Sequence, residues 1–447
     1  MSPPPRPGGL SGERNVGAQV AAYAVGQAVS FPLNLLFDLL IARALGPALR
    51  GEWFLIIATV TLLAHLLSVG IPAYAVYRLG KEPAAAGLLN VVVLTYAGIV
   101  AVLGTAVGLL STSVGLHLRM LTPQGYSVAG VLAATELYII CSAGLLTGMG
   151  RVQTLSRVNV ATAAITVVVG AGPLFVLRLS AVTALTGYLV ARLLAATLMA
   201  RAVGVSRERG EHRWGPVVRD MMRFGAAGQL GTVAVLTYQR VNLFFVGSIV
   251  GTQAVGYYSV AESLSTRLAV LVGPLQVAFA APISRANERA AAQWTSQLVR
   301  IAVLLLVAVG VPLVAVAAPL LRGLYGGDYA PAAAVFRLLL PAGALTTAAS
   351  LVALFFSGHA GRPMINSVVS LTTMAISIPL SYVLVRNFGM VGAASSALIS
   401  GAVIFGLVYG LFVVRNRLPL GAGLVPKRTD WAVLRDIAGT IARVRRR

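Results

Sequence analysis

The chain is a succession of long apolar segments separated by short polar ones. About 20 mostly apolar residues are enough to cross a bilayer as a helix. By this criterion we predict twelve spans, at residues 19–42, 53–76, 88–110, 127–149, 157–177, 181–203, 224–250, 254–281, 298–321, 333–356, 365–385 and 391–414. The alternating pattern of a transmembrane barrel is absent. The sequence therefore predicts an all-α polytopic membrane protein.

The composition agrees with this pattern. Of the 447 residues, 57% are hydrophobic and only 11% are charged. A soluble globule of this size needs a polar surface that such a chain cannot supply. We therefore expect lipid to be the solvent for most of the protein.

The net charge of +22 is distributed unevenly along the chain. If the spans alternate in direction, twenty-five Lys and Arg lie on the side of both termini and seven on the other. Basic residues concentrate on the cytoplasmic side of membrane proteins. This predicts a multi-pass protein of the cytoplasmic (inner or plasma) membrane with both termini cytoplasmic. It favours anionic lipids as partners of the basic segments and argues against nucleic acid.

The longest internal polar segment divides the spans six and six. The predicted parts are a disordered cytoplasmic tail (1–16), an N-lobe (17–203), a cytoplasmic inter-lobe loop (204–222), a C-lobe (223–414) and a basic cytoplasmic tail (415–447). In the last part, residues 430–443 fit either an interfacial amphipathic helix or a disordered basic tail.

Internal similarity indicates a duplication. A shift of 205 residues aligns four pairs of glycines: Gly26 with Gly231, Gly46 with Gly251, Gly51 with Gly256, and Gly187 with Gly392. Gly150-Arg151 and Gly361-Arg362 form a further matching pair at a different offset. An even number of spans per half gives both halves the same orientation. We therefore expect two six-helix lobes related by a pseudo-two-fold axis along the membrane normal.

Signatures of enzymes and metal sites are missing. Neither Lys81 nor Lys427 belongs to a phosphate-binding loop, and the four histidines lack zinc-ligand spacing. No nucleophile-elbow motif occurs, and Cys141 is expected to be a buried structural thiol. The sequence predicts neither catalysis nor a bound metal or cofactor.

Six charged residues fall inside predicted spans, where each costs about 2.5–3.5 kcal/mol on insertion scales. They are Asp38, Glu136, Arg192, Arg240, Glu262 and Arg267. One interpretation is a polar cavity between the halves, to which Asn34, Gln239 and Asn242 add polar surface. The other is ion pairing for assembly, for instance Asp38 with Arg240, or Glu136 with Arg192.

In a cavity, the two kinds of charge predict different roles. The planar guanidinium fork of Arg192, Arg240 or Arg267 suits a phosphate ligand. The carboxyl groups of Asp38, Glu136 and Glu262 are candidates for binding a coupling ion, H⁺ or Na⁺.

Five short motifs resemble polysaccharide flippases, a family of the multidrug/oligosaccharidyl-lipid/polysaccharide exporter superfamily. They begin at Ile41 (IARALGPALRGEWF), Val246 (VGSIVGTQAVGYYSVA, followed by APISR), Leu324 (LYGGDYAPAA), Gly361 (GRP) and Phe388 (FGMVGAA). One departure is Asn242, because many relatives have an acidic residue in this span.

The resemblance implies two lobes around a central cavity and transport by alternating access. The substrate would be a polyprenyl-pyrophosphate-linked oligosaccharide, moved from the inner to the outer leaflet for cell-surface polysaccharide assembly. Polysaccharide-assembly proteins are candidate partners. Arg43 and Arg50 would flank the outer mouth of the cavity.

Three alternatives stay open. An ion-coupled exporter of small cationic compounds would need a mainly acidic cavity, whereas the six buried charges are balanced. A membrane-embedded polymerase or ligase would need large outer loops, and the predicted ones are short. A non-transporting scaffold for a synthesis complex is the third.

Overall fold

The computed structural model describes residues 11–113, 123–173, 180–204, 214–273, 275–276, 279, 283–284, 286–427 and 430. Within these ranges the chain is helical and contains no strand. The main helices are α1 (Ser11–Leu67), α2 (Ile71–Lys81), α3 (Ala86–Ser113), α4 (Pro123–Gly148), α5 (Val152–Ile165), α7 (Ala181–Val203), α8 (Trp214–Phe245), α9 (Thr252–Thr266), α11 (Glu288–Ala315), α12 (Ala317–Tyr325), α13 (Ala332–Leu354) and α14 (Pro363–Asn416).

Short helical turns extend or connect these helices. They are η1 (Pro83–Ala85), η2 (Thr166–Gly170), η3 (Val246–Val250), η4 (Arg267–Leu271), η5 (Gly327–Tyr329), η6 (Phe355–His359) and η7 (Leu420–Gly423). In the described ranges, nine helices are long and apolar enough to cross a membrane. The all-α prediction is therefore confirmed.

The difference between nine helices and twelve predicted spans has a local cause. Helix α14 contains two predicted spans, and α1 contains the span 19–42 and most of the span 53–76, which ends in α2. Both helices are interrupted by non-helical backbone, α1 at Gly46 and α14 at Gly389. The predicted span 254–281 is helical as α9 only to Thr266, after which the backbone tightens into the 3₁₀ turn η4.

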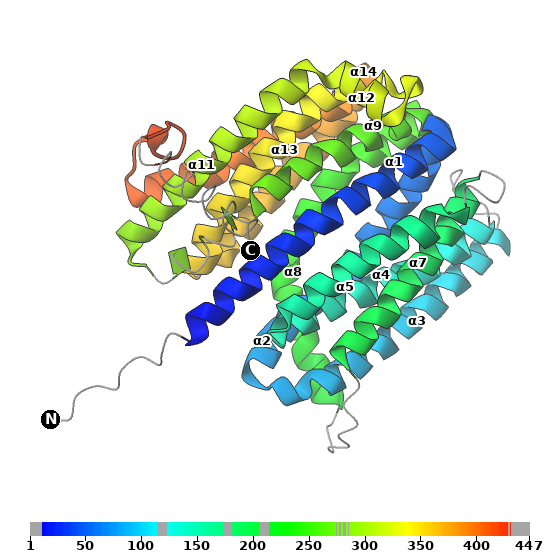
Figure 1. The fold of residues 1–447 in the computed structure, drawn as a ribbon, viewed down its shortest axis with the longest axis horizontal. Helices are drawn as coiled ribbons and strands as arrows, with labels where there is room; N and C mark the ends of the chain where they lie inside the picture. The colour runs from blue at the N-terminus through cyan, green and yellow to red at the C-terminus, as the bar shows by residue number, and fades with distance from the viewer. Residues whose placement is uncertain are drawn as a thin grey trace, which may run out of the picture.

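Figure 1 shows the arrangement of the helices. Helices α3, α4, α5 and α7 lie on one side, and α9, α11, α13 and α14 lie on the other, with α1 running between them. The buried apolar core follows the same division: one cluster is built mainly from the second group, and two smaller clusters from α1 to α7. We call the described residues of α1 to α7 the N-lobe and those of α8 to α14 the C-lobe.

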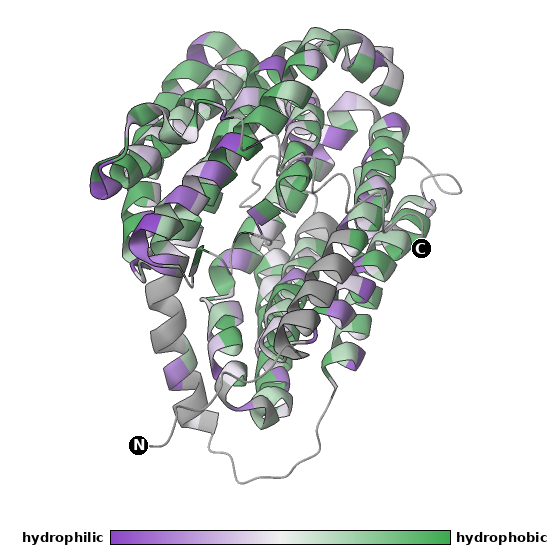
Figure 2. Cartoon of the chain, turned by 60° about the vertical axis from the view of Figure 1, so that its left-hand side comes forward, coloured by the Kyte–Doolittle hydropathy of each residue, from purple (hydrophilic) through white to green (hydrophobic). Residues whose placement is uncertain are grey.

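Hydrophobic residues predominate along the helices (Figure 2), and some of them are exposed on the outside. On α3, Val102 is 69% exposed and Val107 is 65% exposed, and Val414 of α14 is 77% exposed. Exposed apolar surface of this extent is stable against lipid rather than against water. The protein is therefore a multi-pass membrane protein.

The predicted repeat is visible as a symmetric contact between the lobes. A Cβ on Gly51 would lie 1.8 Å from the carbonyl oxygen of Thr252, and a Cβ on Gly256 would lie 1.9 Å from that of Pro47. Pro47 and Thr252, like Gly51 and Gly256, are separated by 205 residues. The glycine of each lobe thus contacts the equivalent residue of the other lobe: Gly51 contacts Thr252, and Gly256 contacts Pro47. A two-fold axis requires such reciprocal contacts.

A second pair of contacts repeats inside the lobes. A Cβ on Gly26 would lie 1.9 Å from Ser156 Oγ, and a Cβ on Gly231 would lie 2.6 Å from Ser367 Oγ. Small residues of this kind allow close approach of membrane helices. The first helix of each lobe therefore packs against an equivalent later helix.

The chain ends differ from their predictions in one respect. Helix α1 begins at Ser11, inside the segment predicted as a disordered tail. Residues 205–213 of the predicted inter-lobe loop and residues 431–447, with nearly all of the predicted interfacial helix, lie outside the described residues, and α8 begins at Trp214, inside the predicted loop.

Candidate functional site

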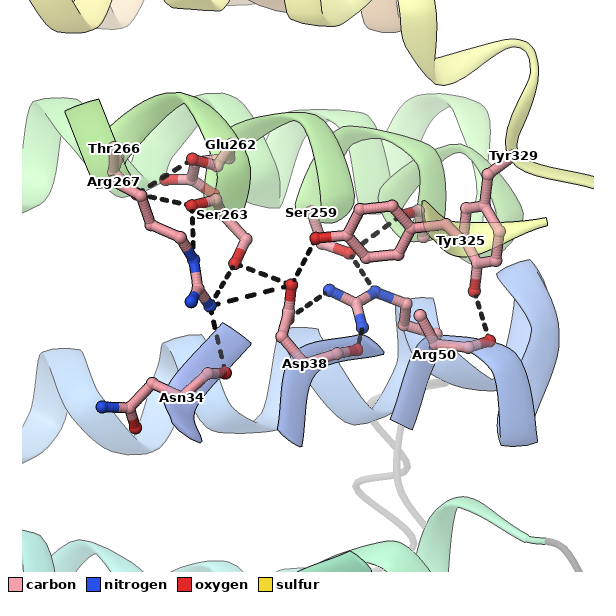
Figure 3. Close-up of polar contacts among 12 residues, drawn as sticks. Asn34, Asp38, Arg50, Ser259, Glu262, Ser263, Thr266, Arg267, Tyr325 and Tyr329 are labelled. Atoms are coloured by element: carbon pink, nitrogen blue, oxygen red, sulfur yellow. Dashed lines mark hydrogen bonds and ion pairs between the residues drawn. The ribbon is translucent and has the colours of Figure 1, made fainter. Parts of the chain in front are cut away.

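An ion pair between two residues of α1 organises the contact between the lobes. Asp38 is 8% exposed and Arg50 is fully buried. Arg50 Nη2 lies 2.7 Å from Asp38 Oδ1, and Nη1 donates to the Asp38 carbonyl oxygen at 2.9 Å. Arg50 Nε donates to Ser259 Oγ of α9 at 3.1 Å. The guanidinium fork therefore joins both limbs of α1 to the C-lobe (Figure 3).

The second carboxylate oxygen of Asp38 is held entirely by the C-lobe. Tyr325 Oη of α12 donates to Asp38 Oδ2 at 2.7 Å, and Ser263 Oγ of α9 donates to it at 3.0 Å. Beside them, Tyr329 Oη donates to the Ala42 carbonyl oxygen at 2.9 Å. We call Asp38, Arg50, Ser259, Ser263 and Tyr325 the interlobe cluster.

Arg267 lies at the end of α9, next to this cluster (Figure 3). Its Nη2 is 3.8 Å from Asp38 Oδ2 and donates to the Asn34 carbonyl oxygen at 3.3 Å. Its Nε donates to the Ser263 carbonyl oxygen at 3.1 Å, and its guanidinium stands 5.9 Å from the ring of Phe31. The 3₁₀ turn that interrupts the predicted span begins at this residue, which turns its side chain toward the N-lobe.

A polar cavity of about 330 Å³ lies beside these groups. We call it the N-lobe cavity, because all its lining residues except Arg267 belong to that lobe. The lining includes Gln27, Ser30, Asn34, Phe37, Asp38, Trp53, Asn159, Thr162, Thr166, Tyr188, Arg192 and Arg267. The predicted residues Asn34, Asp38, Arg192 and Arg267 therefore meet in one place.

Glu136 and Tyr188 hold the side chain of Arg192 in place at the wall of the N-lobe cavity. Its Nε donates to Glu136 Oε1 at 2.5 Å, and its Nη2 pairs with Glu136 Oε2. Tyr188 Oη donates to the same carboxylate at 3.3 Å, and Tyr188 stacks on Phe37 with ring centroids 5.9 Å apart. The ion pairing of Glu136 with Arg192, predicted as one of two alternatives, is confirmed.

The charges around the N-lobe cavity do not cancel. Two carboxylates, those of Asp38 and Glu136, face three guanidinium groups, those of Arg50, Arg192 and Arg267. The surplus is one positive charge. Such a site attracts an anion. Arg50 is buried with its donors committed, so the guanidinium groups that line the cavity and can donate to a ligand are those of Arg192 and Arg267.

The other predicted charges form a separate site in the C-lobe. Arg240 Nη1 lies 3.3 Å from Glu262 Oε1, and both line a cavity of about 150 Å³ together with Gln239 and Asn242. Asn242 is buried and accepts a hydrogen bond from Ser381 Oγ at 2.6 Å. The pair of Asp38 with Arg240, which was one example of the ion-pairing alternative, does not form, because Asp38 pairs with Arg50 and Arg240 pairs with Glu262.

Arg43 and Arg50 do not flank an open mouth. Arg50 is buried in the interlobe cluster. Arg43 Nε and Nη2 donate to the carbonyl oxygens of Leu324 and Gly323, at 2.9 and 2.8 Å, and thereby tie α1 to α12. Both residues hold the lobes together at the Gly46 end of the molecule, because the backbone there brings α1 against α9 and α12.

In the described ranges, no group of three or more His, Cys, Asp and Glu is placed to hold a metal ion.

The sequence profile described as Polysaccharide biosynthesis protein matches residues 16–284, more than half of the chain. The chain belongs to this family. No curated protein sequence matches it. The polysaccharide biosynthesis match includes every residue that lines the N-lobe cavity and ends before Tyr325. The family resemblance predicted from five short motifs is confirmed at this level.

Solved structures share the fold of this polysaccharide biosynthesis family member. The lipid II flippase MurJ in an inward closed conformation has a TM-score of 0.70 at 14% identity, with 90% of this chain and 88% of that chain covered. An inward-facing multidrug resistance MATE transporter of the MOP superfamily has 0.68 at 16%, with coverages of 87% and 98%. A MOP superfamily transporter from Pyrococcus furiosus has 0.66 at 17%, with coverages of 89% and 95%. The chain therefore has the fold of MOP-superfamily transporters.

Several residues of the site were missed by sequence reasoning. Ser259, Ser263 and Tyr325 are uncharged, so the search for charge inside apolar segments passed over them. Tyr325 does lie in one of the five motifs that carried the family resemblance. The motif marked this position, but it indicated no role for the tyrosine. In the aromatic wall of the N-lobe cavity, Trp53 likewise lies in one of the five motifs without an assigned role, whereas Tyr188 gave no signal in a chain rich in apolar residues.

Proposed function

We propose that the protein is a flippase that moves a polyprenyl-pyrophosphate-linked oligosaccharide from the inner to the outer leaflet by alternating access, for cell-surface polysaccharide assembly. The observation that carries the proposal is the surplus positive charge at Arg192 and Arg267 in the N-lobe cavity. A pyrophosphate supplies the anion, and its oxygens accept from the guanidinium groups. The family match and the MurJ-like fold support the same substrate class.

The positions of basic residues give the proposal its direction. The excess of Lys and Arg on the side of both termini assigns that side to the cytoplasm and the Gly46 end to the outside. The interlobe cluster and the Arg43 contacts then close the outer end. In the transport cycle, these contacts break and re-form while the two lobes move as bodies.

Ion coupling is part of the proposal, with H⁺ or Na⁺ as the ion. Asp38 and Glu136 are both committed to short ion pairs. Glu262 Oε2 is buried and has no hydrogen-bond partner within the described ranges. Of the three carboxylates, Glu262 is therefore our candidate for the coupling site, because its Oε2 atom is available to bind the coupling ion.

Reconstituted protein tests this proposal. The probe is a fluorescent polyprenyl-pyrophosphate-linked oligosaccharide in liposomes, and the readout is its transfer between leaflets, measured by quenching from outside. Arg267→Ala is expected to lower the rate about tenfold or more, since charged hydrogen bonds contribute about 1.5–3 kcal/mol. Arg337→Ala is the matched control, because Arg337 is exposed and lies away from the cavity. Equal rates with and without wild-type protein would refute the proposal.

An exporter of small cationic compounds is the second candidate, because MATE multidrug transporters share the fold. The surplus positive charge of the N-lobe cavity repels a cation, so we rank it second. Uptake of a fluorescent cationic dye into the same liposomes separates the two candidates.

A further inference from the structure

The C-lobe contains a groove that the proposed function leaves without a role. Its volume is about 370 Å³, which is in the range of small-molecule sites, roughly 300–1,000 Å³. Its polar lining consists of hydroxyl and amide groups, from Thr232, Gln239, Thr346, Ser350, Asn366 and Ser370, among others. Of the described residues that line it, none carries a charge. We call it the neutral groove.

The neutral groove and its smaller neighbour stand where the N-lobe cavity stands in the other half. Asn34 of the N-lobe cavity corresponds to Gln239 at the offset of 205 residues, and Gln27 corresponds to Thr232. At the same offset, Arg192 corresponds to Ala397, which lines the smaller C-lobe cavity. The duplication therefore produced two polar sites, and only the N-lobe site keeps the guanidinium group of Arg192.

One atom of the neutral groove lacks a partner. Asn366 Nδ2 donates to the Ala353 carbonyl oxygen at 3.0 Å. Asn366 Oδ1 is buried and, within the described part of the chain, accepts no hydrogen bond. A buried acceptor without a donor is unfavourable, and a ligand that donates a hydrogen bond relieves the penalty.

The polar sites form a row across the two lobes. Tyr238, Gln239 and Thr346 line both the neutral groove and the smaller C-lobe cavity. Thr266 lines that smaller cavity, and the next residue, Arg267, lines the N-lobe cavity. Figure 3 shows these two residues side by side at the end of α9. A ligand with an anionic end and an uncharged extension fits this order.

We propose that the neutral groove is a subsite for uncharged, hydroxyl-rich sugar residues, while Arg192 and Arg267 hold the phosphates of the same molecule. This inference rests on the proposed function. Sugar hydroxyls both donate and accept, so they complement mixed amide and hydroxyl groups, including Asn366 Oδ1. An acyl chain would leave these groups unsatisfied, and an anion would find no cation there.

Binding measurements on the full-length protein in lipid nanodiscs test the subsite. One probe is polyprenyl pyrophosphate, and the other is the same lipid carrying a neutral N-acetylhexosamine disaccharide. Wild-type protein is expected to bind the sugar-bearing probe about tenfold more tightly. Asn366→Leu is expected to remove most of that difference, through the loss of a buried hydrogen bond, and to leave affinity for the sugarless probe unchanged.

Two further variants keep the test decisive. Thr232→Leu narrows the neutral groove, and it changes an exposed lining residue, so the protein is expected to fold. This variant therefore tests the sugar preference even if Asn366→Leu folds poorly. Asn387→Leu is the matched control, because Asn387 also donates to a backbone carbonyl but is exposed and outside the groove. Arg267→Ala is expected to weaken both probes equally.

The outcomes separate this inference from the proposed function. Equal affinity of the wild type for both probes, or a sugar preference unchanged in both Asn366→Leu and Thr232→Leu, overturns the subsite. If Arg267-dependent binding of the sugarless probe persists in that case, the proposed function stands. Failure of the wild type to bind either probe overturns both.

Discussion

Asp38 and Arg50 form an ion pair 2.7 Å long although they lie 12 residues apart in one helical element. In a straight helix this separation would be about 18 Å. The contact exists because Gly46, with φ of 67°, adopts a left-handed conformation that turns the chain back on itself. The backbone turn at Gly46, in the motif between the first two predicted spans, thus positions the charged groups of Asp38 and Arg50 that join the lobes.

Removing one partner of this pair is expected to cost much more than removing both. Arg50→Met leaves the Asp38 carboxylate buried without its main counter-charge, which typically costs about 3–5 kcal/mol. The double variant Asp38→Asn/Arg50→Met is expected to regain most of this loss. Thermal unfolding in one detergent or nanodisc preparation measures both. A double variant no more stable than Arg50→Met would contradict a buried ion-pair role.

Tyr325 is expected to control opening at the Gly46 end. Tyr325→Phe removes the hydrogen bond to Asp38 Oδ2 between the lobes and preserves the ring. A hydrogen bond to a charged group is worth about 1.5–3 kcal/mol, so the closed state should lose about tenfold or more in population. Labelling of a cysteine introduced at Ala42, whose side chain is fully buried against the C-lobe, with an impermeant maleimide measures this, since Cys141 is buried. Tyr382→Phe, at an exposed tyrosine, is the control.

The symmetric glycine contact predicts equal effects at two distant positions. A Cβ on Gly51 or Gly256 would overlap a backbone carbonyl of the other lobe. Gly51→Ala and Gly256→Ala are each expected to destabilise the closed Gly46 end by about 1–3 kcal/mol through overpacking. The labelling rate of the same introduced cysteine measures this loss of the closed state. Gly80→Ala is the matched control, because nothing lies within 4 Å of a Cβ there. A large effect at only one of the two glycines would argue against the pseudo-two-fold contact.

Much of the fold was predictable from the sequence because hydropathy and helix length are coupled in a membrane. The repeat was also predictable, since Gly51 and Gly256 have to be small for the same steric reason in each lobe. Hydropathy did not reveal the break at Arg267, because apolar residues continue beyond it. The contact of Arg267 with the Asn34 carbonyl oxygen joins residues 233 positions apart, which no local pattern encodes.

The site was predictable in part. Charge inside apolar segments singled out Asp38, Arg192 and Arg267, because burial of charge is costly, and the structure brings these three residues to one cavity. Depth along a span does not determine which helices are neighbours, so the pair of Asp38 with Arg240, offered as one example of the ion-pairing alternative, does not form and Arg50 is the partner of Asp38. Tyr325 lies 287 residues from Asp38, and its phenol carries no charge that would mark it. The polar groups of the neutral groove are common in membrane helices and gave no signal individually.

The segment after α14 is expected to detach from the C-lobe in acid. Asp430 accepts from Arg300 Nε at 2.8 Å, from Arg300 Nη2 at 3.0 Å and from the Lys427 backbone N–H at 2.8 Å. Burial raises the pKa of the Asp430 carboxyl, but the hydrogen bonds from Arg300 and Lys427, with the charge of Arg300, outweigh it. The pKa of Asp430 therefore lies below its ordinary value.

Because docking lowers the pKa of Asp430, the docked segment is expected to lose stability at low pH. The ionised carboxylate stabilises the docked segment fully above the pKa of the undocked group, about 3.9, and this contribution is lost as pH falls through the lower docked value. Amide hydrogen exchange at Ala422 and Leu424, corrected for the intrinsic rate, should stay slow from pH 7 to 5 and accelerate below about pH 4. Asp430→Asn should exchange faster throughout and lose the acid transition, whereas Asp328→Asn, at an exposed carboxylate, should behave as wild type. An acid transition that survives in Asp430→Asn would assign it to another group.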